Sequence, residues 1–202
     1  MSTSLASASS TALLKQDRYL IRRKFWSFLG QKFFLYDESS NLVGYVKQKA
    51  FKLKEDIRVY TDTNCTNELL VIKARQIIDF SAAYDIVDPT TQQKLGALRR
   101  KGLASTFVRD TWEILDNSDQ AVGTVQEDSA LLGLFRRYVF ALLPQSYSVT
   151  MNGAAAADFK QTWNPFIPKM WCTFTAPNSS FDRRLGLGAA VLISAIEGKQ
   201  NR

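Results

Sequence analysis

The length, composition and charge of the chain limit the functions open to it. The 202 residues are 46% hydrophobic and carry 26 Lys and Arg against 19 Asp and Glu, a net charge of +7. A chain of this size builds a sizeable core without disulfide or metal staples. Histidine is absent, which excludes Ser-His-Asp and Cys-His nucleophile systems and most catalytic zinc sites. The basic balance favours an anionic partner.

The N-terminal stretch differs in composition from the rest of the chain. Residues 1–12 carry no charge and are rich in Ser, Thr and Ala, and their apolar cluster is too short for a signal peptide. We expect residues 1–17 to form a disordered tail, with an organelle transit peptide as the less favoured alternative. Residues 18–202 are expected to form one domain.

Four stretches then repeat one pattern, in which an apolar run ends in Asp, a short polar turn follows, and a second alternating run ends in basic residues. The aspartates are Asp37, Asp62, Asp88 and Asp116. Asp, Asn and Ser in the turns bond to their own backbone, so each unit predicts a β-hairpin. Strand alternation assigns four equivalent residues to the inner face: Val46, Ile72, Leu98 and Val125.

The positions one and three residues further along each unit are expected to face outward, and three of the four units carry a basic pair there. These pairs are Lys47 and Lys49, Lys73 and Arg75, and Arg99 and Lys101. Hairpins that follow one another would bring alternate strands ~10 Å apart. The pairs then predict one outer basic stripe, extended by Lys52 and Lys54 in the connection after the first hairpin.

Further strands are expected before and after the repeats, which gives about twelve in all. They cover residues 19–25, 147–151, 156–162 and 170–175, and residues 31–37, the first strand of the first hairpin, are then the second strand of the chain. Between them, residues 128–143 have the pattern of a helix that starts at Asp128 or Ser129 and ends at Pro144.

The last predicted element is a helix over about residues 183–197. Residues 185–196 carry no charge, Ser180 or Asp182 can cap the start, and Gly198 is expected to end the helix. A helix that is apolar on every side is buried in protein or in a membrane. Twelve residues span only ~18 Å of a hydrocarbon core of ~30 Å. The sequence therefore predicts a mainly β fold, a closed barrel of about twelve strands wrapped around a hydrophobic C-terminal helix.

The repeated hairpins and the uncharged, small-residue-rich final helix resemble the tubby C-terminal-like superfamily, which includes LURP-one-related proteins and phospholipid scramblases. Residues 22–25, 33–37 and 44–47 are similar to the start of LURP-one-related domains. Residues 181–184, followed by 185–196, are similar to the end of both groups. The resemblance covers roughly residues 18–199. It implies binding of phosphoinositide headgroups through basic residues outside the barrel.

The resemblance to scramblases is incomplete. Scramblases resemble one another in an acidic calcium-binding segment before the final helix, whereas residues 176–182 here contain one carboxylate, Asp182. Because a Ca²⁺ site uses six or more oxygen ligands, usually from several acids, calcium-triggered scrambling is not expected. The cysteine cluster and the Pro-rich arm of scramblases are also missing.

No motif in the sequence indicates catalysis. A P-loop and a dinucleotide fingerprint are absent, and acidic pairs such as Glu55-Asp56 are typical of solvated turns. Cys65 and Cys172 are interpreted as unpaired thiols in a reducing cytoplasm, with one disulfide as the alternative. We therefore expect no enzyme activity, no cofactor and no metal site, although an unusual Lys or Asp catalyst stays open.

The sequence thus predicts a cytoplasmic, non-catalytic module, peripheral at membranes, that binds anionic phospholipid or a protein partner. The outer basic stripe carries this prediction. Two alternatives stay open: a lipid-handling protein of the scramblase type, and a regulatory protein associated with nucleic acid through the same basic face. The opposing interpretation is that the stripe has a purely structural role. The exposed face of a strand in a soluble barrel must be polar, and exposed Lys residues also prevent a strand from pairing with the strands of other molecules.

Overall fold

The computed structural model describes residues 13–25, 30–48, 56–75, 82–101, 111–128, 144–162, 164, 166–177 and 180–200. The helix predicted over 128–143 lies outside these residues except for its first position. So do Lys49, Lys52 and Lys54, and the tail up to residue 12. Leu13 is buried, and the hydroxyl of Tyr19 donates a hydrogen bond to its carbonyl oxygen.

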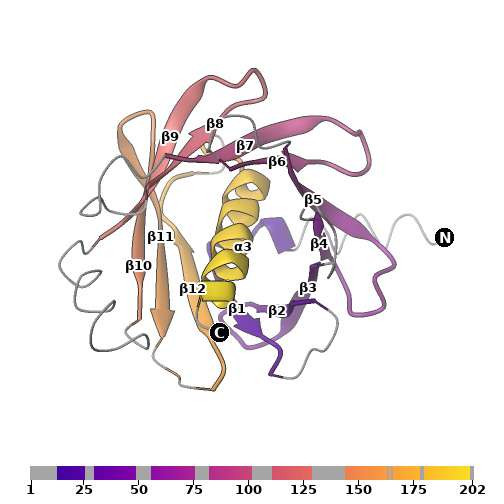
Figure 1. The fold of residues 1–202 in the computed structure, drawn as a ribbon. Coiled ribbons are helices and arrows are strands. Elements are labelled where there is room, and N and C mark those ends of the chain that lie inside the picture. Colours follow the sequence, from indigo (N-terminus) through magenta and orange to yellow (C-terminus); the bar gives the residue numbers. More distant parts are fainter. Residues whose placement is uncertain are drawn as a thin grey trace.

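Twelve antiparallel strands form a closed barrel, as predicted, in which each strand pairs with its neighbours in the sequence and β1 pairs with β12. The strands are β1 (Arg18–Arg23), β2 (Lys32–Tyr36), β3 (Leu42–Gln48), β4 (Asp56–Tyr60), β5 (Glu68–Ala74), β6 (Ala83–Val87), β7 (Lys94–Arg100), β8 (Thr111–Leu115), β9 (Ala121–Glu127), β10 (Ser146–Met151), β11 (Ala154–Thr162) and β12 (Lys169–Phe174). The helix α3 (Arg183–Gln200) runs through the middle of the barrel (Figure 1).

The two ends of the barrel differ in charge because of the hairpin repeat. The strands β2, β4, β6 and β8 finish at one end, here called the turn end, where the four turn aspartates lie. The opposite end, here called the loop end, is where β1 and β7 end at Arg23 and Arg100, and where Lys47 and Lys73 lie one residue before the ends of β3 and β5. The four turn aspartates and the basic residues near the ends of β1, β3, β5 and β7 thus lie toward opposite ends of their strands.

The interior of the barrel is filled by inward-facing strand residues and by the helix. The four side chains predicted to face inward are buried with no solvent exposure, namely Val46, Ile72, Leu98 and Val125. A barrel of this many strands leaves a volume that its own side chains do not fill, and buried residues of α3 such as Leu187 and Leu192 occupy it.

The helix begins where the sequence predicts and ends later. The backbone N–H of Arg184 donates to the side chain of Asp182 at 2.8 Å, so Asp182 caps the start. The expected end at Gly198 is wrong, because α3 continues to Gln200. A Cβ atom on Gly188 would lie 2.8 Å from Ile86 Cδ1 on β6, so the small residue allows the close approach of helix and barrel wall.

Candidate functional site

The residues of the predicted basic stripe lie on the outside of the barrel where the structure describes them. Lys47, Lys73 and Lys101 are exposed, and Arg75 and Arg99 are half-buried. The strands that carry them, β3, β5 and β7, alternate with β4, β6 and β8 around the closed sheet. The stripe is therefore not continuous, because the intervening strands present their own side chains between the basic residues.

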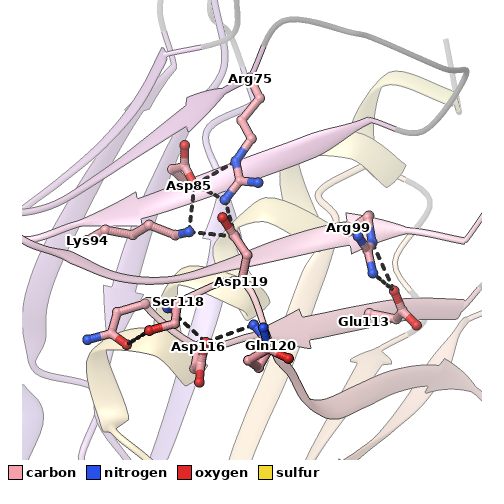
Figure 2. Close-up of polar contacts among 10 residues, drawn as sticks. Arg75, Asp85, Lys94, Arg99, Glu113, Asp116, Ser118, Asp119 and Gln120 are labelled. Carbon is pink, nitrogen blue, oxygen red and sulfur yellow. Dashed lines mark hydrogen bonds and ion pairs between the residues drawn. The ribbon is translucent and has the colours of Figure 1, made fainter.

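The intervening strands supply carboxylates that neutralise much of the stripe. The guanidinium of Arg75 contacts Asp85 on β6 at 2.6 Å and Asp119 in the β8–β9 turn at 2.5 Å. Asp119 also accepts from the ammonium of Lys94 at 2.5 Å, so that Asp85, Arg75, Asp119 and Lys94 form one network (Figure 2). The pKa of Asp119 is lowered, first by the hydrogen bond from Arg75.

A second ion-pair group holds the basic pair at the end of β7. Glu113 on β8 lies directly opposite Arg99 and accepts from its guanidinium at 2.7 Å (Figure 2). The ammonium of Lys101 lies 3.3 Å from the same carboxylate. The hydrogen bond from Arg99 is the first cause of the lowered pKa of Glu113. These contacts favour a structural role for this half of the stripe.

Glu113→Gln is expected to lower the free energy of unfolding at pH 7 by up to about 1 kcal/mol, because the pair with Arg99 is partly exposed. A carboxyl whose pKa is lowered by folding stabilises above its unfolded pKa and loses this contribution as the pH falls through its folded pKa. Thermal unfolding at pH 7 and below about pH 4 should therefore show the difference between wild type and variant shrink on acidification. A difference that grows on acidification would contradict this assignment.

On the side of the barrel from β12 across β1 and β2 to β3, five of the described cations form no ion pair with a described carboxylate. Lys32 on β2 lies directly opposite Lys47 on β3. The backbone N–H of Lys24 donates to the carbonyl of Lys32 at 2.8 Å, which adds a third lysine beside the pair. Like charges directly opposite in a sheet are destabilising, so local stability does not explain this arrangement.

A second pair of like charges lies across the strands that close the barrel. Arg22 on β1 is directly opposite Lys169 on β12. The guanidinium of Arg22 lies over the ring of Tyr36 at 5.6 Å from its centroid, and its buried Nε has no hydrogen-bond partner. An aromatic ring holds a guanidinium in place without neutralising it, so the charge of Arg22 remains available to an anion.

These five residues, Arg22, Lys24, Lys32, Lys47 and Lys169, are here called the cationic patch. Within the described part of the chain, no carboxylate forms an ion pair with any of them. Of these five residues, only Lys47 was predicted from the sequence. The other four depend on the pairing of β12 with β1 and on the register of β2, which the repeat pattern does not specify.

The described residues offer little for metal or thiol chemistry. They contain no group of side chains able to hold a metal ion. Asp182 is held by the guanidinium of Arg184 at 2.7 Å. Cys65 and Cys172 are both free thiols, as predicted, and burial raises the pKa of Cys172. None of the described helices is both long enough and apolar enough to span a bilayer.

Fold and surface together define a class of protein: a closed, twelve-stranded antiparallel barrel around a central helix, with charged groups on its outer face. The family model described as LURP-one-related matches residues 42–179. The chain therefore belongs to the LURP-one-related family, which is part of the tubby C-terminal-like superfamily. The matched region runs from β3 to a point just before α3. A search of curated proteins gave no match.

Proposed function

We propose that this chain is a non-catalytic module that binds anionic phospholipid surfaces, with phosphoinositide-type headgroups as the preferred class, through the cationic patch. The observation that carries the proposal is the pair of like-charge contacts, Lys32 with Lys47 and Arg22 with Lys169. Each contact costs stability unless an anion binds between or above the two cations.

The size of the patch suits reversible attachment. A Lys or Arg near an anionic membrane surface contributes about 1 kcal/mol, so the five residues together contribute about 5 kcal/mol. This corresponds to a dissociation constant of about 0.2 mM, the range of a peripheral protein. We propose that four further lysines of the stripe also contribute to the free energy of membrane binding. They are Lys73, which is exposed, and Lys49, Lys52 and Lys54. We further propose a cytoplasmic, membrane-peripheral location, because anionic lipids are concentrated in the cytoplasmic leaflet.

The family and the charge distribution support this proposal over the alternatives. Membership of the tubby C-terminal-like superfamily makes phosphoinositide binding outside the barrel the expected use of the surface. The turn aspartates lie at the opposite end, so the net field of the barrel is expected to orient it toward an anionic surface. Scrambling of the calcium-triggered type is less favoured, because the carboxylate of Asp182 is engaged by Arg184.

Vesicle co-sedimentation tests this function. The protein should bind phosphatidylcholine vesicles that contain phosphatidylserine or a phosphoinositide, and binding should weaken steeply as salt is raised. Pure phosphatidylcholine vesicles are the control. Equal binding to anionic and neutral vesicles at low salt would refute the proposal. Retention on single-stranded DNA with a steep salt slope, without vesicle binding, would favour a nucleic-acid partner instead.

A further inference from the structure

Two large apolar side chains protrude from the loop end of the barrel. Phe25 is 57% exposed and Phe166 is 71% exposed, and among the described residues only Leu42 is a comparably exposed large hydrophobic side chain, at 45%. Leu42 begins β3 and so lies at the turn end. Single exposed hydrophobic residues are normal on a soluble protein, so the position of the two phenylalanines matters more than their exposure.

The two phenylalanines belong to connections that leave adjacent strands at the same place. Arg22 on β1 pairs with Lys169 on β12, and the N–H of Arg23 donates to the carbonyl of Pro168 at 3.1 Å. Phe25 lies two residues beyond Arg23, and Phe166 lies two residues before Pro168. The side chain of Asn164 accepts from the backbone N–H groups of Phe166 and Ile167, at 3.0 and 2.8 Å.

Two residues of the cationic patch lie close to these apolar side chains along the chain. Lys24 directly precedes Phe25, and Lys169 follows Phe166 by three residues. The headgroup region of an anionic bilayer attracts the cations, and the boundary with the acyl chains accepts aromatic rings. Aromatic rings beside basic residues can also stack on the bases of single-stranded nucleic acid, so retention on single-stranded DNA without vesicle binding would overturn a membrane partner.

We propose that Phe25 and Phe166 insert into the interface of the bilayer that the cationic patch attracts, so that the barrel docks with its loop end toward the membrane. This inference rests on the proposed function, because the patch brings the rings to the surface. Insertion adds an apolar term to binding, which salt does not screen. Partial burial of two rings is expected to strengthen binding about 10- to 100-fold.

The first test compares Phe25→Ser/Phe166→Ser with Leu42→Ser on vesicles containing phosphatidylserine. The double variant is expected to bind about 10- to 100-fold more weakly than wild type at every salt concentration, and its affinity should fall with salt as steeply as that of wild type, because the cationic patch is unchanged. Leu42→Ser, at the turn end, should bind as wild type does. Equal affinity of the double variant and wild type would overturn insertion while leaving the proposed function intact. Failure of wild type to bind anionic vesicles would overturn both.

The second test reports insertion directly and does not depend on affinity. In a Cys65→Ser background, Phe166→Cys is labelled with an environment-sensitive fluorophore, and Leu42→Cys is labelled as the matched control. Cys172 is buried and its thiol pKa is raised, so it stays unlabelled. On anionic vesicles the emission of the label at position 166 should shift to the blue, and that at position 42 should not. Equal shifts at the two positions, or no shift at 166 while the protein is bound, would contradict insertion.

Discussion

Leu192→Ala is expected to lower the free energy of unfolding by about 2–5 kcal/mol, the usual cost of truncating a fully buried leucine. Leu192 has no solvent exposure and lies on α3, inside the barrel. The strands around it are fixed by a closed ladder of hydrogen bonds, so the wall has little freedom to collapse onto the space that the missing atoms leave. The cost should therefore be near the upper part of this range.

Chemical denaturation of wild type and variant at pH 7 measures this difference. Leu42→Ala is the matched control, because the same side chain is removed from the outside of the barrel, where it is 45% exposed. The control should change stability by no more than about 0.5 kcal/mol. Similar costs for the two variants would mean that α3 does not form the core of the barrel.

Lys32→Glu/Lys47→Glu is expected to abolish most binding to anionic vesicles. Each reversal removes an attractive charge and adds a repulsive one, about 2 kcal/mol per position, so the pair changes affinity about 1,000-fold. The two lysines are direct neighbours across β2 and β3, and no described carboxylate holds either of them. Their full charge is therefore available to an anionic surface.

A charge reversal at the turn end separates this local effect from a change in net charge. Lys15 is exposed and lies close before β1, at the end of the barrel that carries the turn aspartates. Lys15→Glu should lower vesicle affinity by less than about threefold, because the six residues of β1, at ~3.3 Å each, lie between Lys15 and the loop end, which is more than the screening length of ~10 Å at moderate salt. A loss as large as that of a single patch reversal would show that binding follows net charge and not the patch.

Much of the fold was predictable because the sequence repeats its local signals. Four aspartate turns separate alternating runs, and each run is long enough for one short strand, so the hairpins and their inward residues follow from local chemistry. The charge-free final segment is too short to span a bilayer and too apolar to lie on a protein surface. The inside of the barrel was therefore the remaining location for this helix. Both predictions needed no knowledge of contacts between distant residues.

The candidate site was less predictable, because it depends on pairing between distant segments. Arg22 and Lys169 become neighbours only when β12 closes the barrel against β1. The register of β2 places Lys32 opposite Lys47, and the sequence alone leaves that register open. Ion pairs such as Arg75 with Asp119 join residues from separate hairpins, so a row of basic residues in the sequence did not reveal which charges are neutralised. The end of α3 was predicted too early, because a glycine near the end of a helix does not by itself show where the helix stops. The helix continues past Gly198 to Gln200.

The most direct test of the cationic patch is to measure stability and vesicle affinity together for Lys32→Glu. This change places a carboxylate opposite Lys47 in the ladder, so it replaces a repulsive cross-strand pair with an attractive one. We expect an unfolding free energy that is equal to wild type or higher by about 0.2–1 kcal/mol, together with an affinity for phosphatidylserine vesicles about 30-fold lower. Wild-type affinity in a variant that is equally stable or more stable would show that the cationic patch does not bind the vesicle surface.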